Sequence, residues 1–350
     1  MPEAAHPAGT IQPPTFDDVR RAARRIAPHV HRTPVFTCAS LDAAVGARIF
    51  FKCENLQKAG AFKFRGACNA VLSLSPEQAA RGVATHSSGN HAAALALAAR
   101  LRGVDAAVVM PHDANRAKRA AVLAYGARIV DCAPTLAGRE EVLARVLADT
   151  DAVRVHPYDD PRVIAGQGTA ALELLAQVPD LDVVIAPVGG GGLIAGTAMA
   201  AGGLAPAVTV LGAEPSAVDD AWRSLHAGRL LAQPGAPTVA DGLRATLGDL
   251  AFPILRARVQ DIVRVGEDAI VRAMRLVWER TKLIVEPSAA VVVAALFEEP
   301  LRFQGRRVGA ILSGGNVDLD ALPWTGGARS HRALTSAMPA PRAMGADHGE

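Results

Sequence analysis

Short apolar runs alternate with alanine-rich segments along most of this 350-residue chain, and this alternation limits the folds it can adopt. The runs are rich in valine and isoleucine and have the length of strands, whereas NHAAALALAARLRG at 90–103 has a helical composition. Strands separated by helices predict a parallel sheet with helices on both faces, the doubly wound α/β class. The predicted strands lie at 48–54, 82–87, 106–110, 128–131, 182–188, 208–214 and 307–312.

The residues that follow each strand are informative, because ligands of such sheets bind beyond the carboxyl ends of the strands. The strand at 182–188 is followed by four glycines, Gly189–Gly192, and then by an apolar helix. Successive glycines let backbone N–H groups close around a phosphate at the positive end of a helix. We therefore predict a phosphate cradle here, rather than a flexible linker.

The same glycines also fit a dinucleotide-binding pattern. Residues 190–195 match G-x-G-x-x-A, and Glu214 ends the next predicted strand, where a ribose-binding acid belongs. A nicotinamide-dependent dehydrogenase is therefore an alternative. It does not account for Lys63, for Asn90 or for the Ser-Gly-Gly-Asn loop at 313–316.

The loops after two further strands, at 87–91 and 313–316, and one lysine point to a single cofactor. Ser87-Ser88-Gly89-Asn90-His91 follows the strand at 82–87, and its small polar residues suit a carboxylate or a simple helix cap. Lys63 lies in the apolar stretch AGAFKFRGA at 59–67, in a chain with 4% aromatic residues. Pyridoxal phosphate carries a phosphate, a ring nitrogen and an aldehyde that condenses with an amine, so it uses all these sites together.

Composition and charge exclude other classes of protein. The formal net charge is only +3, and no basic run is interleaved with aromatic residues, so no nucleic-acid partner is expected. No apolar stretch reaches the ~20 residues of a membrane span, and no signal peptide is recognisable, so we expect a cytoplasmic protein without a membrane partner. The four cysteines have no metal-binding spacing and are expected to be reduced thiols.

The order of several motifs resembles the serine racemase and threonine (serine) dehydratase family of fold-type-II pyridoxal-phosphate enzymes. The resemblance runs from about residue 15 to 324. It implies a tryptophan synthase β-like fold with two doubly wound open-sheet domains and the cofactor between them. The motifs are AFKFRGA (61–67), SSGNH (87–91), AYGA (124–127), HPYDDPRVIAGQGT (156–169), PVGGGGLIAG (187–196), AEPSAVDD (213–220), ADG (240–242), LVWERTKLIVEPSAA (276–290) and LSGGNVDL (312–319).

The same resemblance predicts the domain organisation. A large cofactor-binding domain is expected from 15–79 together with 156–324, and a small domain from 80–155. Residues 1–14 and 325–350 are rich in small residues and proline, and both are predicted to be disordered. A homodimer is the assembly that the resemblance implies.

The resemblance also assigns the cofactor-binding residues. Lys63 would form the Schiff base, in an apolar pocket that favours its neutral amine. Phe62 would pack on the cofactor ring, Asn90 would bond the ring hydroxyl, and Ser313 would face the pyridine nitrogen. The other cofactor-binding residues implied are Gly189, Gly190, Gly191, Gly192, Gly242 and Glu286.

Lys63 and Ser88 are the catalytic residues that the resemblance implies. Lys63 would remove the α-proton, and Ser88 stands where the racemases have a second acid/base, although a serine here is equally explained as a helix cap. Arg139 also suits a second carboxylate, as in 3-hydroxyaspartate dehydratases. The implied substrate-binding residues are Ser87, Ser88, Asn90, His91 and Arg139.

A divalent-cation site is implied as well. Glu214, the backbone carbonyl of Val218, and Asp220 match the cation site of the racemase branch. Oxygen ligands suit Mg²⁺, or Ca²⁺ or Mn²⁺, rather than zinc.

We therefore expect an ammonia-lyase that dehydrates a small L-β-hydroxy amino acid, L-threonine or L-serine, to a 2-oxo acid and ammonia. The alternatives are a serine racemase with both activities and a 3-hydroxyaspartate dehydratase. Tyr158 in HPYDDP is closer to the dehydratases, and Ala61 and Ala245 depart from residues frequent in the family. A nicotinamide-dependent dehydrogenase and a catalytically inactive binding relative are the hypotheses from other classes.

Overall fold

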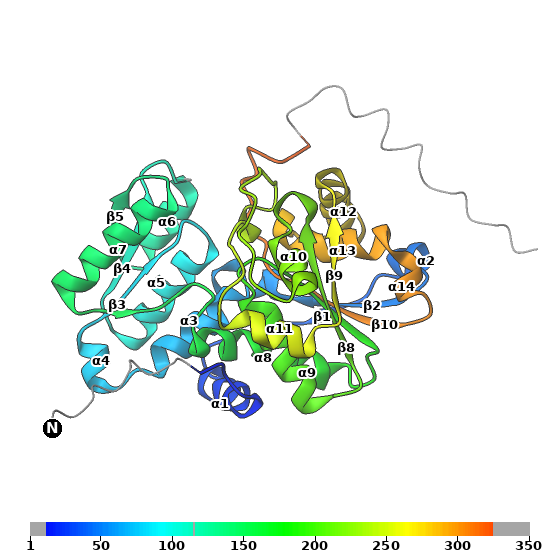
Figure 1. The fold of residues 1–350 in the computed structure, drawn as a ribbon, viewed down its shortest axis with the longest axis horizontal. Coiled ribbons are helices and arrows are strands. Elements are labelled where there is room, and N and C mark those ends of the chain that lie inside the picture. The colour runs from blue at the N-terminus through cyan, green and yellow to red at the C-terminus, as the bar shows by residue number, and fades with distance from the viewer. Residues whose placement is uncertain (1–11, 115, 325–350) are drawn as a thin grey trace, which may run out of the picture. The chain divides into compact units, whose positions relative to one another are not determined.

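The computed structural model describes residues 12–114 and 116–324, and within them it forms two sheets flanked by helices (Figure 1). The ends predicted to be disordered, 1–14 and 325–350, lie outside the described residues apart from 12–14. The described residues 318–324 belong to a unit separate from the rest, and in it Ala321 N–H donates to the Asp318 carbonyl at 3.2 Å. No helix in the described part of the chain has the length and apolarity needed to cross a membrane.

The larger sheet has six strands and the smaller has four. In spatial order the larger sheet contains β1 (Val35–Phe36), β2 (Arg48–Cys53), β10 (Arg307–Leu312), β7 (Val183–Pro187), β8 (Thr209–Pro215) and β9 (Asp261–Val265). The smaller sheet contains β5 (Arg128–Cys132), β4 (Ala106–Pro111), β3 (Val83–His86) and β6 (Val153–Arg154). All neighbouring strands are parallel except β1, which pairs antiparallel with β2. The prediction of a parallel α/β fold is confirmed.

Helices connect these strands. The α-helices are α1 (Phe16–Ile26), α2 (Ala39–Val45), α3 (Lys63–Leu72), α4 (Pro76–Ala80), α5 (Asn90–Arg102), α6 (Arg116–Ala124), α7 (Leu136–Thr150), α8 (Pro161–Gln177), α9 (Gly192–Leu204), α10 (Asp220–Ala227), α11 (Ala251–Arg258), α12 (Glu267–Thr281), α13 (Pro287–Glu298) and α14 (Pro300–Phe303). Short 3-10 helices are η1 (Glu54–Leu56), η2 (Lys58–Gly60), η3 (Ser216–Val218) and η4 (Asp241–Leu243).

Both faces of each sheet are buried, which explains the nearly continuous apolar strands. In the smaller sheet, Ala107 and Val109 of β4 pack with α7, whereas Val108 and Met110 pack with α5 and α6. In the larger sheet, α13 contacts β7, β8, β9 and β10, while α8 and α9 pack together with α1. The division into a large and a small domain stays a prediction, because both sheets lie in one compact unit, Met1–Val317.

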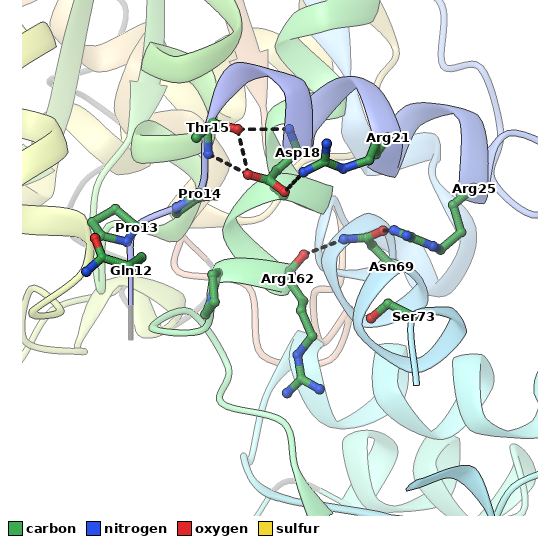
Figure 2. A pocket seen from close by; sticks show the side chains of 12 residues that line it. Gln12, Pro13, Pro14, Thr15, Asp18, Arg21, Arg25, Asn69, Ser73 and Arg162 are labelled. Carbon is green, nitrogen blue, oxygen red and sulfur yellow. Dashed lines mark hydrogen bonds and ion pairs between the residues drawn. The ribbon is translucent and has the colours of Figure 1, made fainter. Parts of the chain in front are cut away.

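The first helix is fixed by its cap and by a polar cluster. Thr15 and Asp18 form the capping box that starts α1, and Val19, Ala22 and Ile26 are its buried face. Figure 2 shows a cavity of about 400 Å³ beside this helix, where Arg25 Nη1 donates to Asn69 Oδ1 at 2.6 Å. No residue of the predicted site is among the described residues that line this cavity. Its polar contacts tie α1 to α3.

A buried ion-pair cluster joins the strand, loop and helix that precede and carry Lys63. Arg65 has 0% exposure, and its Nε and Nη2 donate to the two Glu54 oxygens at 2.7 and 2.8 Å. Its Nη1 and Nη2 donate to the Glu173 oxygens at 2.8 and 2.9 Å. Lys52 completes the cluster, with its Nζ 2.7 Å from Glu173 Oε2. The cluster therefore ties β2, η1, α3 and α8 together.

Breaking this cluster should destabilise the fold. Arg65→Met leaves Glu54 buried without its cation, and we expect a loss of about 3–5 kcal/mol in the free energy of unfolding. The shift of the urea midpoint measures it. Arg145→Met is the control, because the Arg145–Glu141 pair is exposed and should contribute at most about 1 kcal/mol. Equal shifts for the two variants would show that the buried cluster does not hold the fold together.

Candidate functional site

Lys63 and the loop after β10 are held side by side by backbone pairing. Ala61 forms an isolated antiparallel bridge with Gly314, and Phe62 N–H donates to the Ser313 carbonyl at 2.9 Å. Lys63 is the first residue of α3, directly after this contact. The structure therefore brings Ser313, which is buried, beside the start of the helix that carries the lysine.

The Lys63 amine lies in an apolar, half-buried setting. Its Nζ donates to the Pro157 carbonyl at 2.8 Å and lies 5.2 Å from the centre of the Phe62 ring. Burial lowers the pKa of Lys63 to about 8, while the nearby Glu286 carboxylate acts in the opposite direction. The lowered pKa makes a reactive, neutral amine accessible near neutral pH, whereas the carbonyl accepts a hydrogen bond from it and fixes its position.

Asn90 and Glu286 form a hydrogen-bonded group near this amine. Asn90 Nδ2 donates to the Glu286 oxygens at 2.8 and 3.1 Å, and Asn316 Nδ2 donates to Asn90 Oδ1 at 3.0 Å. Burial raises the pKa of Glu286 to about 7, against the opposing hydrogen bond from Asn90. Two predicted residues that are far apart in the chain are therefore in contact, and Asn316 is a third member that the sequence analysis quoted only within a motif.

The glycine loop has no room for side chains. Gly191 has a φ of 86° and precedes α9, which begins at Gly192. A Cβ atom on Gly190 would lie 2.3 Å from the Tyr158 ring, and one on Gly192 would lie 2.9 Å from the Tyr158 carbonyl. The remaining predicted glycine, Gly242, lies in η4, where its N–H donates to Ser288 Oγ at 3.0 Å. The loop thus presents bare backbone at a helix N-terminus, as a phosphate cradle requires.

The serines after β3 do not cap the next helix. Gly89 is the N-cap of α5, which has no side-chain capping bond, and Ser87 Oγ accepts the Gly89 N–H at 3.3 Å. The explanation of Ser88 as a cap of this helix is therefore wrong. Ser88 is half-buried at the carboxyl end of β3, directly before Gly89 and Asn90.

Several basic groups with unpaired nitrogens gather near these serines. His91 is buried, and neither of its ring nitrogens has a hydrogen-bond partner among the described residues. The same holds for His86 Nε2 and Arg139 Nε. Burial lowers the pKa of His86, and the Arg139 guanidinium is close enough to lower it further. No ion pair of Arg139 occurs within the described ranges, so this cation has polar atoms available for a ligand.

Glu214 and Asp220 are buried carboxylates that form no ion pair in the described part of the chain. Glu214 Oε1 accepts the Trp222 N–H at 2.6 Å, and Asp220 Oδ2 accepts the Leu247 N–H at 2.8 Å. Burial raises the pKa of Glu214 to about 9 and that of Asp220 to about 6. Val218 lies in η3 between them along the chain. Two buried oxygen donors that resist ionisation fit a hard divalent cation, which would favour their charged forms.

No cluster of three or more His, Cys, Asp or Glu side chains arranged to hold a metal ion is found among residues 12–114 and 116–324. The predicted cation site has only two such side chains, together with one backbone oxygen, so it does not reach a cluster of three side chains. Of the four free cysteines, Cys38 is half-buried and the other three are buried.

The residues present fit pyridoxal phosphate, the cofactor implied by the sequence. The glycine loop precedes a helix N-terminus and is packed so closely that only glycine fits there, and Lys63 is an amine with a lowered pKa. The HPYD turn at 156–159 was not predicted to be part of the site. Its Pro157 carbonyl and Tyr158 ring contact Lys63 and Gly190, and the quoted motif HPYDDP was the available signal.

The reactivity of Lys63 should rise with pH through its lowered pKa. Since only the neutral amine reacts, reductive methylation of Lys63 in cofactor-free protein, followed by peptide mass spectrometry, should increase up to a plateau with a midpoint near pH 8. Glu286→Gln removes the carboxylate that favours the ammonium form, so the midpoint should move to lower pH. Glu286 is the N-cap of α13, and Glu298 is the exposed last residue of that helix. Glu298→Gln is therefore the control and should leave the midpoint unchanged. An upward shift in Glu286→Gln would contradict the assignment.

Comparison with known proteins agrees with this geometry. Residues 26–314 match the model of the family "Pyridoxal-phosphate dependent enzyme". The β-hydroxyaspartate dehydratase of Paracoccus denitrificans is 51% identical over 311 residues, covering 89% of this chain and 99% of the relative. The structure of maize serine racemase is 48% identical, with a TM-score of 0.86, covering 88% of this chain and 95% of that one.

The structure of the T.th. threonine deaminase is also 48% identical, with a TM-score of 0.83, covering 87% of this chain and 99% of that one. The resemblance, the fold class and the cofactor predicted from the sequence are confirmed at the level of the family. The chain belongs to the fold-type-II pyridoxal-phosphate dependent enzymes, in the group of lyases and racemases.

Proposed function

We propose that the protein is a 3-hydroxyaspartate dehydratase, which forms a 2-oxo acid and ammonia by β-elimination. The observation that carries this proposal is the half-buried Arg139, whose Nε has no partner and which makes no ion pair among the described residues. A second substrate carboxylate would pair with such a guanidinium. L-Threonine and L-serine, expected first from the sequence, carry an α-carboxylate but no second carboxylate.

The charge around the site supports a dicarboxylic substrate. Arg139 and Arg154 supply positive charge beside His86, while burial lowers the pKa values of His86 and His91, which therefore act as neutral hydrogen-bonding groups. One substrate carboxylate would bind near Ser87, Asn90 and His91, as predicted, and the other would bind to Arg139. The name of the 51% identical relative supports the same substrate class.

Lys63 is the base in this proposal. Its amine, with a pKa near 8, would take the proton from the substrate Cα, while the Cβ–O bond breaks and the hydroxyl leaves as water after protonation. The cofactor would supply the electron sink for this step. The enamine that is released hydrolyses to the 2-oxo acid and ammonia. The Pro157 carbonyl would hold the Lys63 amine whenever it is free.

A second candidate is serine racemisation, and Ser88 favours it. A racemase needs an acid/base on the side of the substrate opposite Lys63, and Ser88 is not engaged in capping α5. The name of the maize relative supports this candidate. We further propose that Mg²⁺, Ca²⁺ or Mn²⁺ binds at Glu214, the Val218 carbonyl and Asp220, because both carboxylates are buried and form no ion pair among the described residues.

Arg139→Met tests the substrate. A charged hydrogen bond contributes about 1.5–3 kcal/mol, so losing a bidentate pair should lower kcat/KM for 3-hydroxyaspartate by at least ~100-fold. Turnover of L-serine, which has no second carboxylate, should change by less than ~3-fold. Release of 2-oxo acid and of the D-enantiomer is measured for both substrates and for L-threonine, with and without Mg²⁺.

Arg145→Met, on the exposed side of the same helix, is the matched control and should behave as the wild type. An equal loss for L-serine in Arg139→Met would contradict a contact with the second carboxylate. If the wild type forms D-serine faster than any 2-oxo acid, the racemase candidate replaces the dehydratase.

A further inference from the structure

The segment Leu247–Ala251 lies directly against the glycine loop. Gly248 N–H donates to the Gly190 carbonyl at 3.2 Å. A Cβ atom on Gly191 would lie 2.6 Å from both Leu247 Cδ1 and Ala251 Cβ. No gap separates the two segments at this point, so the position of one sets the position of the other.

Two carboxylates from distant parts of the chain hold this segment. Asp220 Oδ2 accepts the Leu247 N–H at 2.8 Å. Asp159 accepts the Asp249 N–H at 3.1 Å and the Leu250 N–H at 2.9 Å. Helix α11 starts at Ala251 and its N-cap, Leu250, makes no side-chain capping bond, so Asp159 supplies the anion at this N-terminus.

Asp159 also belongs to the turn that contacts Lys63. His156 Nδ1 accepts the Asp159 N–H at 2.9 Å, which fixes the turn. Within it, the Pro157 carbonyl accepts the Lys63 amine, and the Tyr158 ring lies against Gly190. One side chain therefore connects the turn beside the lysine with the segment that covers the glycine loop.

We propose that Asp159 is a positioning residue that couples the cation site at Glu214 and Asp220 to the cofactor site. The contacts run from Asp220 to Leu247, from Leu247–Ala251 to the glycine loop, and through Asp159 to the turn at Lys63. A cation that orders Asp220 thereby orders the glycine loop and the lysine. The inference rests on the cation site of the proposed function, and the coupling is reciprocal, as linkage requires.

Asp159→Asn tests the coupling in the full chain, because the amide nitrogen cannot accept a backbone N–H. In the wild type, Mg²⁺ should tighten the binding of pyridoxal phosphate by about 5-fold or more, measured by absorbance titration of cofactor-free protein. In Asp159→Asn this ratio should fall below the wild-type value, because the route to the turn at Lys63 is weakened while Leu247–Ala251 still contacts the glycine loop directly. The affinity of Asp159→Asn for Mg²⁺ should differ from that of the wild type by less than ~3-fold. It is followed by the fluorescence of Trp222, whose backbone N–H donates to Glu214.

Asp182→Asn is the matched control. Asp182 Oδ2 also accepts a backbone N–H, from Arg307 at 2.8 Å, but at the far end of β10. Asp182→Asn should keep the wild-type ratio of cofactor affinities with and without Mg²⁺. If Asp159→Asn does not fold, Leu250→Pro is the second test. It removes the Leu250 N–H that Asp159 accepts, and the Leu250 φ of −76° suits proline.

The outcomes separate the two proposals. A wild-type ratio in both Asp159→Asn and Leu250→Pro overturns the role of Asp159. Mg²⁺ binding without any effect on the cofactor in the wild type overturns the coupling and leaves the cation site standing. No Mg²⁺ binding to the wild type overturns the cation site and the coupling with it.

Discussion

The arrangement of the site depends on the ion pairs of the fully buried Arg65 guanidinium. It lies two residues after Lys63 and bonds both oxygens of Glu54 and both oxygens of Glu173. A buried cation requires this complete set of partners, because each unpaired charge would cost several kcal/mol. The helix that presents the lysine can therefore take only one position relative to β2 and α8, and the pocket around the amine is fixed with it.

The site divides into a fixed part and a part with unused bonding capacity. Around Lys63, Asn90 and Glu286, the polar groups are hydrogen-bonded within the protein. Around His86, His91 and Arg139, buried nitrogens have no partner within the described ranges. Since buried polar groups are normally satisfied, the second part is where a ligand gains most from binding. The unpaired nitrogens are therefore concentrated among the predicted substrate-binding residues and their neighbours, while Asn90, predicted to bind both cofactor and substrate, belongs to the hydrogen-bonded part.

The sequence predicted the elements that have a clear periodic or compositional pattern, and it missed those that do not. The long apolar strands and the glycine loop were predicted, because burial on both faces and bare backbone leave direct traces in the residue types. The two-residue strands β1 and β6 are too short to show a period, and β9 has the exposed Arg264 within it.

Contacts that depend on tertiary register were not predictable from one sequence. The Asn90–Glu286 bond joins residues 196 positions apart, and Asp159 bonds backbone N–H groups about 90 positions away. Backbone donors leave no trace in residue type. The resemblance supplied Glu286 as a site residue, but it did not supply this pairing.

The chain enters the smaller sheet through β3 and leaves it through β6, and these two strands are hydrogen-bonded neighbours. The two ends of this excursion are thus only about one strand spacing, ~4.8 Å, apart. Every residue predicted to bind the substrate lies within the excursion, whereas Lys63 and the glycine loop lie outside it. Exchanging this one segment between relatives would replace all the predicted substrate-binding residues together. The parts of the chain that carry Lys63 and the glycine loop would stay unchanged.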